Sequence, residues 1–228
     1  MTDILDVDDL TPDELDAVLD RAAAIKAAHE AGEHDRPLAD RTLAMLFEKP
    51  STRTRISFET GMTQLGGHAI FLGPDDIHLG HGEPIKDTAR AIGRYADFVM
   101  ARVFDHSDVE TLAEYAQVPV INGLTDDAHP CQTLADLLTI REHFDPGVSV
   151  AWVGDGNNVC QSFVIGAAMD GLDLTVATPE GYEVSDDVLT HTSVYTTSAS
   201  AMAASGSWVV SAGSPTAAAR SSTSALTS

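Results

Sequence analysis

The chain has 228 residues, about 43% of them hydrophobic, which suffices for one large domain or two small ones, each with its own core. Its formal net charge of −22 disfavours nucleic acid and anionic membranes as partners, because both would repel it. The sequence has no run of 18 apolar residues, and its acidic start, MTDILDVDDL, does not resemble a signal peptide, so we expect a cytoplasmic protein.

Helical and strand patterns alternate along the chain. Thr11, Pro12 and Glu14 form a predicted helix start, and that helix is expected to end before Gly32. In chain order there follow a strand at 42–47, a helix at 51–65, a strand at 68–72, a helix at 85–96, a strand at 98–103, a helix at 108–116 and a strand at 118–122. The alternation continues with a helix at 132–144, a strand at 148–154, a helix at 159–169 and a strand at 172–178.

This alternation predicts an α/β protein with two doubly wound parallel-sheet domains, the second of them incomplete. The predicted turn Asp145-Pro146-Gly147 separates a first domain at 1–145 from a partial second domain at 146–187, expected to keep about two strands and one helix. In such folds ligands gather at the carboxyl ends of the strands.

The composition changes beyond residue 187. All 35 acidic residues precede the segment 188–228, which is mostly Ser, Thr and Ala. Two interpretations stay open: a disordered low-complexity tail, or a segment introduced by a shift of reading frame. The abrupt loss of acidic residues favours the second, and an intact frame in the coding sequence would exclude it.

The acidic, lysine-poor composition also suits a protein that works in high salt. Equal stability with and without molar salt would contradict that adaptation.

Positive charge and hydroxyl groups are concentrated in the stretch FEKPSTRTRISFE at 47–59. Three of the chain's thirteen basic residues lie between Lys49 and Arg55, where a predicted strand gives way to a helix. The first N–H groups of a helix and a nearby arginine attract an anion. Ser51, Thr52, Arg53 and Thr54 are therefore predicted to bind phosphate, the alternative being simple helix capping.

Three further polar residues lie where a ligand is expected. Arg102 ends an apolar strand, a costly place for a charge unless a ligand or an acid lies there. His129 precedes Pro130 at a helix start, with Gln132 three residues later on the same face. An imidazole and an amide can together bind a carbonyl and an NH₂ group. The alternative for His129 is a purely structural role.

Two other features are less specific. The stretch Gly154-Asp155-Gly156-Asn157-Asn158 is a weak dinucleotide-turn pattern because it lacks a third glycine, but it suits a tight strand-to-helix turn that presents polar groups. Cys131 and Cys160 have no metal-ligand or disulfide spacing and are expected to be buried, reduced thiols.

Taken together, FEKPSTRTRISFE, LGHGEPIKDTAR, the Arg-Val-Phe at 102–104, HPCQTLADLLTI and WVGDGNNV resemble the aspartate/ornithine carbamoyltransferase family, and its ornithine branch in particular. The resemblance covers roughly residues 1–185. The family's later DxxxSMG and HCLP stretches, which supply ornithine contacts and a catalytic cysteine, are not found after residue 185.

The resemblance implies transfer of a carbamoyl group from carbamoyl phosphate to the δ-amine of ornithine, giving citrulline and phosphate, without a metal or cofactor. The resemblance assigns the binding of the phosphate group to Ser51, Thr52, Arg53 and Thr54. It assigns the binding of the carbamoyl group to Arg102, His129 and Gln132, and the binding of ornithine to Asn158. It also implies a homotrimer in which a loop containing His78, aligned with a family glutamine, reaches across from a neighbouring subunit. A binding-only remnant, or a transferase for another amine such as aspartate or putrescine, stays open.

Overall fold

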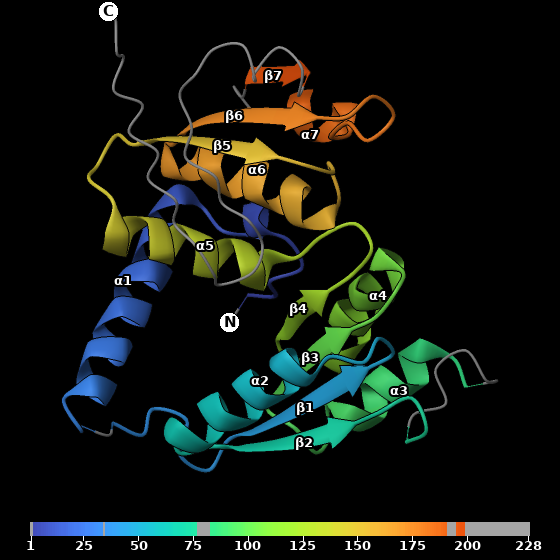
Figure 1. Ribbon diagram of the computed structural model, residues 1–228. Helices are drawn as coiled ribbons and strands as arrows, with labels where there is room; N and C mark the ends of the chain where they lie inside the picture. Colours follow the sequence, from blue (N-terminus) through green and yellow to red (C-terminus); the bar gives the residue numbers. More distant parts are fainter. Residues whose placement is uncertain (1, 34, 77–82, 191–194, 199–228) are drawn as a thin grey trace, which may run out of the picture.

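The computed structural model describes residues 2–33, 35–76, 83–190 and 195–198 (Figure 1). The first unit contains β1 (Thr42–Phe47), α2 (Thr52–Gln64), β2 (His68–Leu72), α3 (Ile85–Ile92), β3 (Phe98–Arg102), α4 (His106–Ala116) and β4 (Val120–Leu124), and the chain reaches it through the 3₁₀ turn η1 (Val7–Asp9) and α1 (Pro12–Glu30), which pack against the second unit. The second contains α5 (Pro130–His143), β5 (Ser149–Val153), α6 (Asn158–Asp170), β6 (Asp173–Thr178), α7 (Asp186–Thr190) and β7 (Tyr195–Ser198).

The predicted α/β class with two parallel sheets is confirmed. One predicted strand is displaced, because β4 spans Val120–Leu124 instead of 118–122. Asn122-Gly123 is a turn-forming pair, yet the chain stays extended there because Val103 N donates a hydrogen bond to Leu124 O at 3.1 Å. Pairing with β3 thus overrides the local preference.

The second sheet is larger than expected. The sequence predicted about two strands and one helix, but β7 pairs in parallel with β6 and the short helix α7 connects them. β7 lies inside the segment 188–228, and α7 crosses residue 187. The apolar residues of that segment do not alternate as they do in a strand, so this pairing could not be predicted from the local sequence pattern. The domain boundaries themselves stay a prediction, and α5, which lies before the predicted boundary at 145, packs against α6 of the second unit.

The first sheet is covered by helices on both faces. Successive residues of β1 point to opposite sides, as the two-residue period of a strand requires. Leu43, Met45 and Phe47 pack with Met62 of α2. Ala44 and Leu46 pack against α3 and α4 on the opposite face. A strand buried on both faces must be apolar throughout, which explains the sequence TLAMLF.

The strand order of this sheet, β2-β1-β3-β4, contains a reversal of winding. From β1 the chain moves outward to β2 through α2, and then crosses back through α3 to β3 on the other side of β1. The carboxyl ends of β1 and β3 therefore flank a point from which the chain leaves in opposite directions. A crevice at such a point is the usual ligand site of an open α/β sheet.

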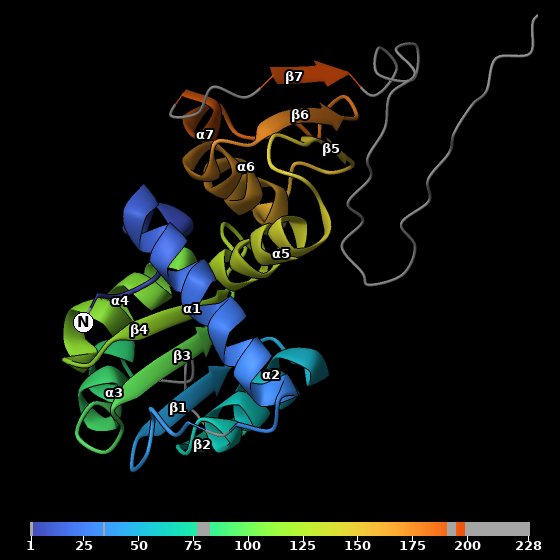
Figure 2. The ribbon, with the colours of Figure 1, turned by 90° about the vertical axis from the view of Figure 1, so that its left-hand side faces the viewer.

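The N-terminal segment joins the two sheets. Ile4 extends the first sheet by pairing with β4, since Ile4 N donates to Val120 O at 2.9 Å and Asn122 N donates to Ile4 O at 2.8 Å. Val7 and Leu15 are then fully buried in the core of the second unit, beside Phe163 of α6. Figure 2 shows α1 running from the second unit along the first. The first residues of the chain are thus part of the contact between the units.

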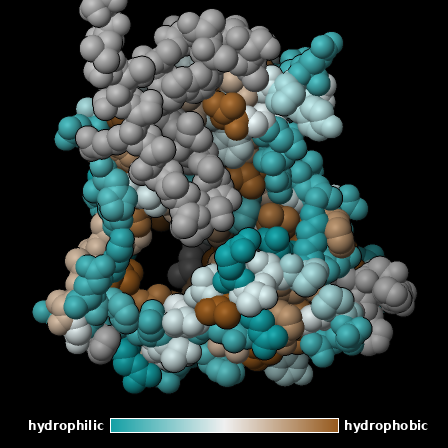
Figure 3. Space-filling model, viewed as in Figure 1, coloured by the Kyte–Doolittle hydropathy of each residue, from teal (hydrophilic) through white to brown (hydrophobic). Residues whose placement is uncertain are grey.

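An apolar hollow of about 420 Å³ opens between α2 and the first sheet. Figure 3 shows the hollowed surface between α1 and α2. Its lining includes Phe58, Met62 and Phe98. Because Phe98 begins β3 and Arg102 ends it, the hollow lies toward the opposite end of the sheet from the predicted phosphate turn. It offers no charged group for a polar substrate.

Two glycines test this packing. A Cβ at Gly93, which caps α3, would lie 1.7 Å from Ala116 O, so Gly93→Ala is expected to lower the free energy of unfolding by about 2 kcal/mol or more. Gly61 lies inside α2 with nothing within 4 Å of such a Cβ, so Gly61→Ala is expected to raise it by about 0.5–1 kcal/mol. Urea denaturation of both variants checks this, and a Gly93→Ala variant as stable as Gly61→Ala would contradict the packing.

Candidate functional site

The candidate site lies at the carboxyl ends of β1 and β3. Phe47 and Arg102, the last residues of these strands, are register partners. The chain leaving β1 stays bound to the end of β3, because Glu48 N and Lys49 N both donate to Arg102 O, at 2.9 and 3.3 Å. Helix α2 starts three residues after Lys49, at Thr52, so its N-terminus opens beside Arg102.

The phosphate turn has the predicted helix-start geometry. Ser51 is the N-cap of α2, and its Oγ accepts a hydrogen bond from Thr54 N at 3.3 Å and donates one to Thr54 Oγ1 at 2.9 Å. Capping therefore occurs, as the alternative interpretation required. It does not exclude an anion, because a capped helix still directs its first N–H groups and its dipole outward.

The two arginines of the turn have different surroundings. Arg55 Nε donates to Glu59 at 2.9 Å and its guanidinium lies over the ring of Phe71 at 3.8 Å, so it is occupied on α2 itself. Arg53 is exposed, and its charge acts on Arg102, lowering the pKa of that guanidinium in addition to the larger effect of burial. Of this pair, Arg53 is the one whose charge acts on Arg102.

Arg102 and His129 each carry a buried nitrogen without a hydrogen-bond partner among the described residues, Nε of Arg102 and Nδ1 of His129. Burial, followed by the Arg102 charge, lowers the pKa of His129 from 6.5 to about 4. The imidazole is therefore neutral at pH 7 and offers one donor and one acceptor nitrogen. Buried polar atoms are nearly always paired in proteins, so these two nitrogens indicate a place for a polar ligand.

His129 is placed by the chain on both sides of it. It follows β4 and is the N-cap of α5, with Pro130 in the first turn as expected. Its backbone N–H donates to Ser162 Oγ of α6 at 2.9 Å. One turn along α5, Gln132 Nε2 donates to Asp136 Oδ1 at 3.0 Å. Gln132 is thus near His129, but its donor is directed along the helix.

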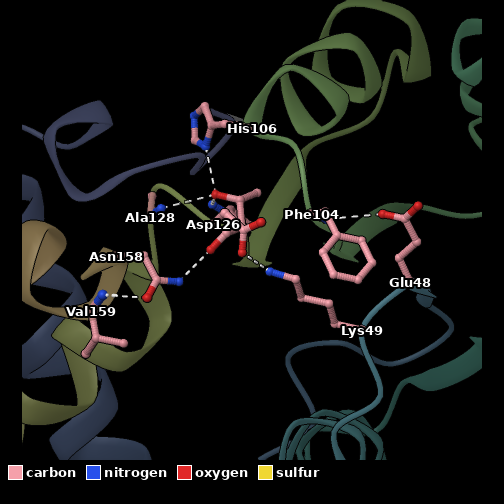
Figure 4. Close-up of polar contacts among 10 residues, drawn as sticks. Glu48, Lys49, Phe104, His106, Asp126, Ala128, Asn158 and Val159 are labelled. Atoms are coloured by element: carbon pink, nitrogen blue, oxygen red, sulfur yellow. Dashed lines mark hydrogen bonds and ion pairs between the residues drawn. The ribbon is translucent and has the colours of Figure 1, made fainter. Parts of the chain in front are cut away.

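Asn158, at the start of α6, contacts the loop that follows β4 (Figure 4). Its Nδ2 donates to Thr125 O at 2.5 Å, and its Oδ1 accepts from Val159 N at 2.9 Å. Thr125 is fully buried, and its Oγ1 accepts from Ala128 N at 3.1 Å and lies 3.0 Å from His106 Nδ1. The predicted ornithine residue therefore holds the second unit against the site loop.

Figure 4 also shows contacts that sequence reasoning missed. Lys49 forms an ion pair with Asp126 and lies 4.6 Å from the centroid of the Phe104 ring. Glu48 accepts a hydrogen bond from Phe104 N at 3.1 Å. Both ends of the ion pair were visible as charges in the sequence, but no spacing rule relates residues 77 positions apart. This network links the chain after β1 to the loops after β3 and β4.

The structure therefore brings together Arg53, Arg102 and His129, places Gln132 one helical turn away, and sets Asn158 across the Thr125 loop. His78 lies outside the described residues. No group of three or more His, Cys, Asp or Glu side chains suited to a metal occurs in the described part of the chain. None of the helices described is long and apolar enough to cross a membrane.

Both cysteines are free thiols. Burial raises the pKa of Cys131 to about 11 and that of Cys160 to about 12, so neither is a thiolate at neutral pH. Cys131 Sγ is hydrogen-bonded to Asn122 O at 3.4 Å. These properties fit packing rather than nucleophilic catalysis.

Two family models match this chain. The model described as the carbamoyl-P binding domain of aspartate/ornithine carbamoyltransferase matches residues 2–142. The model described as the Asp/Orn binding domain of the same family matches residues 146–208. The second match continues beyond residue 187, into the segment without acidic residues.

Named relatives agree with these matches. Ornithine carbamoyltransferase of Haloquadratum walsbyi is 66% identical over 190 residues, which are 82% of this chain and 62% of the relative. The enzyme of the same name from Carboxydothermus hydrogenoformans is 56% identical over 183 residues, 79% of this chain and 59% of the relative. The chain thus spans about three fifths of the length of these curated relatives.

Solved structures are similar as well. Ornithine carbamoyltransferase from Pyrococcus furiosus has a TM-score of 0.83 and 48% identity, over 86% of this chain and 66% of that chain. The structure from Gloeobacter violaceus has a TM-score of 0.80 and 40% identity, over 92% of this chain and 73% of that chain.

The depressed pKa of His129 predicts a pH effect on stability. Between pH 6.5 and about 4 the unfolded chain binds a proton at this residue that the folded chain does not, so the free energy of unfolding falls as the pH is lowered through this window. Above pH 6.5 this proton has no effect on the free energy of unfolding. Below about pH 4 the full loss amounts to at most about 3 kcal/mol. Urea denaturation from pH 7 to pH 4.5 should show a shallower loss in His129→Gln than in the parent chain. Equal pH dependence of the two proteins would contradict the assignment.

Proposed function

The chain belongs to the aspartate/ornithine carbamoyltransferase family, and from this premise we propose that it transfers the carbamoyl group of carbamoyl phosphate to the δ-amine of L-ornithine. The products are L-citrulline and phosphate. One observation supports this more than any other: the unpartnered nitrogens of Arg102 and His129 are buried beside the N-terminus of α2. Such a site suits a ligand with a phosphate at one end and a carbonyl at the other.

The phosphate end is assigned to the turn before and within α2. Ser51, Thr52 and Thr54 supply hydroxyl and backbone donors, and the guanidinium of Arg53 supplies charge. As the C–O bond to the leaving group breaks, negative charge builds on the phosphate, and these fixed dipoles stabilise it without rearrangement. No metal is needed for this step, since the cationic groups come from the chain.

The carbamoyl end is assigned to Arg102, His129 and Gln132. The neutral His129 can donate to the carbonyl oxygen beside Arg102, and both then stabilise the oxyanion that forms when the amine attacks. Gln132 would exchange its bond to Asp136 for one to the carbamoyl group. This exchange is feasible because the amide is one turn from His129 and moves by side-chain rotation alone.

The amine end is assigned to Asn158 and to a neighbouring subunit. Asn158 would orient ornithine so that its uncharged δ-nitrogen attacks the carbamoyl carbon, giving a tetrahedral intermediate that expels phosphate. Holding both substrates in line supplies much of the rate acceleration. We assign His78 to the carbamoyl phosphate site of the adjacent subunit of a homotrimer.

The setting we propose is the arginine metabolism of a cytoplasm rich in salt. The net charge of −22 supports it, because a densely charged acidic surface stays hydrated at high ionic strength and repels nucleic acid and anionic membranes.

Arg53→Ala is expected to weaken carbamoyl phosphate binding by at least tenfold, because a charge-assisted hydrogen bond to an anion is worth about 1.5–3 kcal/mol. The matched control is Arg55→Ala, two residues away on α2, whose guanidinium is already occupied by Glu59 and Phe71. Isothermal titration calorimetry with carbamoyl phosphate compares the two. Equal affinity of Arg53→Ala and the parent chain for carbamoyl phosphate would contradict the assignment of the phosphate site to this turn.

Substrate choice is tested by product formation. Purified chain with carbamoyl phosphate should form citrulline from ornithine and little product from aspartate or putrescine, as followed by mass spectrometry. A preference for another amine would replace ornithine in the proposal. Tight binding of carbamoyl phosphate without any product would identify a binding-only protein.

A further inference from the structure

A chain of hydrogen bonds leads from the backbone of His129 to a carboxylate near the N-terminus. His129 N donates to Ser162 Oγ at 2.9 Å, and Ser162 Oγ donates to Asp6 Oδ1 at 2.8 Å. Because the serine hydroxyl has one proton and gives it to Asp6, its lone pairs face His129. The direction of both bonds is therefore set by the carboxylate, and bonds in such a chain strengthen one another.

The carboxylate is itself held rigidly. Asp6 Oδ1 also accepts from Val7 N at 2.8 Å, and Asp6 N donates to Asp9 Oδ2 at 3.0 Å, which closes a capping box around η1. Two residues earlier, Ile4 pairs with β4 at the edge of the first sheet. Asp6 is therefore held close to β4, and β4 is also the strand whose end leads into His129.

The middle of the chain belongs to the second unit. Ser162 lies on α6 and is fully buried, so water cannot replace either of its partners. The imidazole of His129 has no hydrogen bond at Nδ1 within the described structure, so the bond of its backbone N–H to Ser162 is the polar contact that holds this residue in place. A shift of that backbone would turn the ring away from Arg102.

We propose that Asp6 is a positioning residue, which acts through Ser162 to fix the backbone of His129 and thereby aims the imidazole at the carbamoyl group. The assignment rests on the function proposed above for His129. It predicts a selective defect: loss of Asp6 affects the carbamoyl end of the ligand, while the phosphate end, held by α2, is untouched.

The test uses the whole chain and the variants Asp6→Ala, Ser162→Ala and the double variant. Calorimetry is expected to show roughly tenfold weaker binding of carbamoyl phosphate and unchanged binding of inorganic phosphate in each single variant. The double variant should lose no more than either single one, because the two residues act in series. Asp8→Ala, which removes an exposed charge from the same turn η1, is the matched control and should bind as the parent does.

A second measurement does not depend on the ligand. The imidazole resonance of His129, identified by its absence in His129→Gln, should titrate with a pKa roughly one pH unit higher in Asp6→Ala and Ser162→Ala, because a displaced ring is less buried. If Asp6→Ala does not fold, Ser162→Ala alone decides. An unchanged His129 pKa, additive losses in the double variant, or an equal loss of phosphate binding would overturn the proposal. If the parent chain binds neither ligand, the proposed function fails, and the His129 resonance still tests the positioning.

Discussion

The reversal of strand order between β1 and β3 is the constraint on which the rest of the site depends. Since the chain leaves β1 for β2 and returns to β3 on the opposite side, the two strand ends are adjacent and the segments after them diverge. The segment that leads into α2 is bonded to the carbonyl of Arg102 in that space, and the charge of Arg53 in the first turn of α2 acts on the Arg102 guanidinium. Backbone pairing of Phe47 with Arg102 holds the spacing, so the site is built on the sheet rather than on a free loop.

Desolvation gives this space its chemical character. In a chain of net charge −22, Arg102 and His129 each have a buried nitrogen without a hydrogen-bond partner among the described residues. Burial and the Arg102 charge together keep His129 neutral, so the imidazole adds no further positive charge beside Arg102, on which the charge of Arg53 also acts. The anionic ligand proposed for this site would satisfy these groups at once, whereas their burial without a partner is a cost to stability.

The second unit contributes to the site through the start of α6. Asn158 bonds to the carbonyl of Thr125, and Ser162, one turn later, bonds to the backbone of His129. Both contacts reach the segment that joins β4 to α5, so the start of α6 helps to fix the position of His129. The N-terminal residues reinforce this contact from the other side, through Asp6 and the buried Val7. The site residues thus depend on three segments that are remote in sequence.

The sequence by itself determined the α/β class, the order of helices and strands, the capped turn at Ser51, and the family to which the motifs belong. Each of these follows from periodicity, capping chemistry or a contiguous motif, all of which are local. Local pattern failed for β4 and for β7, where pairing with a neighbouring strand extended the chain against its composition. Only the tertiary structure decided that the charge of Arg53 acts on Arg102, that Lys49 pairs with Asp126, and that Asp6 reaches His129 through Ser162. Those outcomes depend on side chains that meet across many tens of residues, and such meetings are set by how the helices cover the sheets, which no spacing along the chain records.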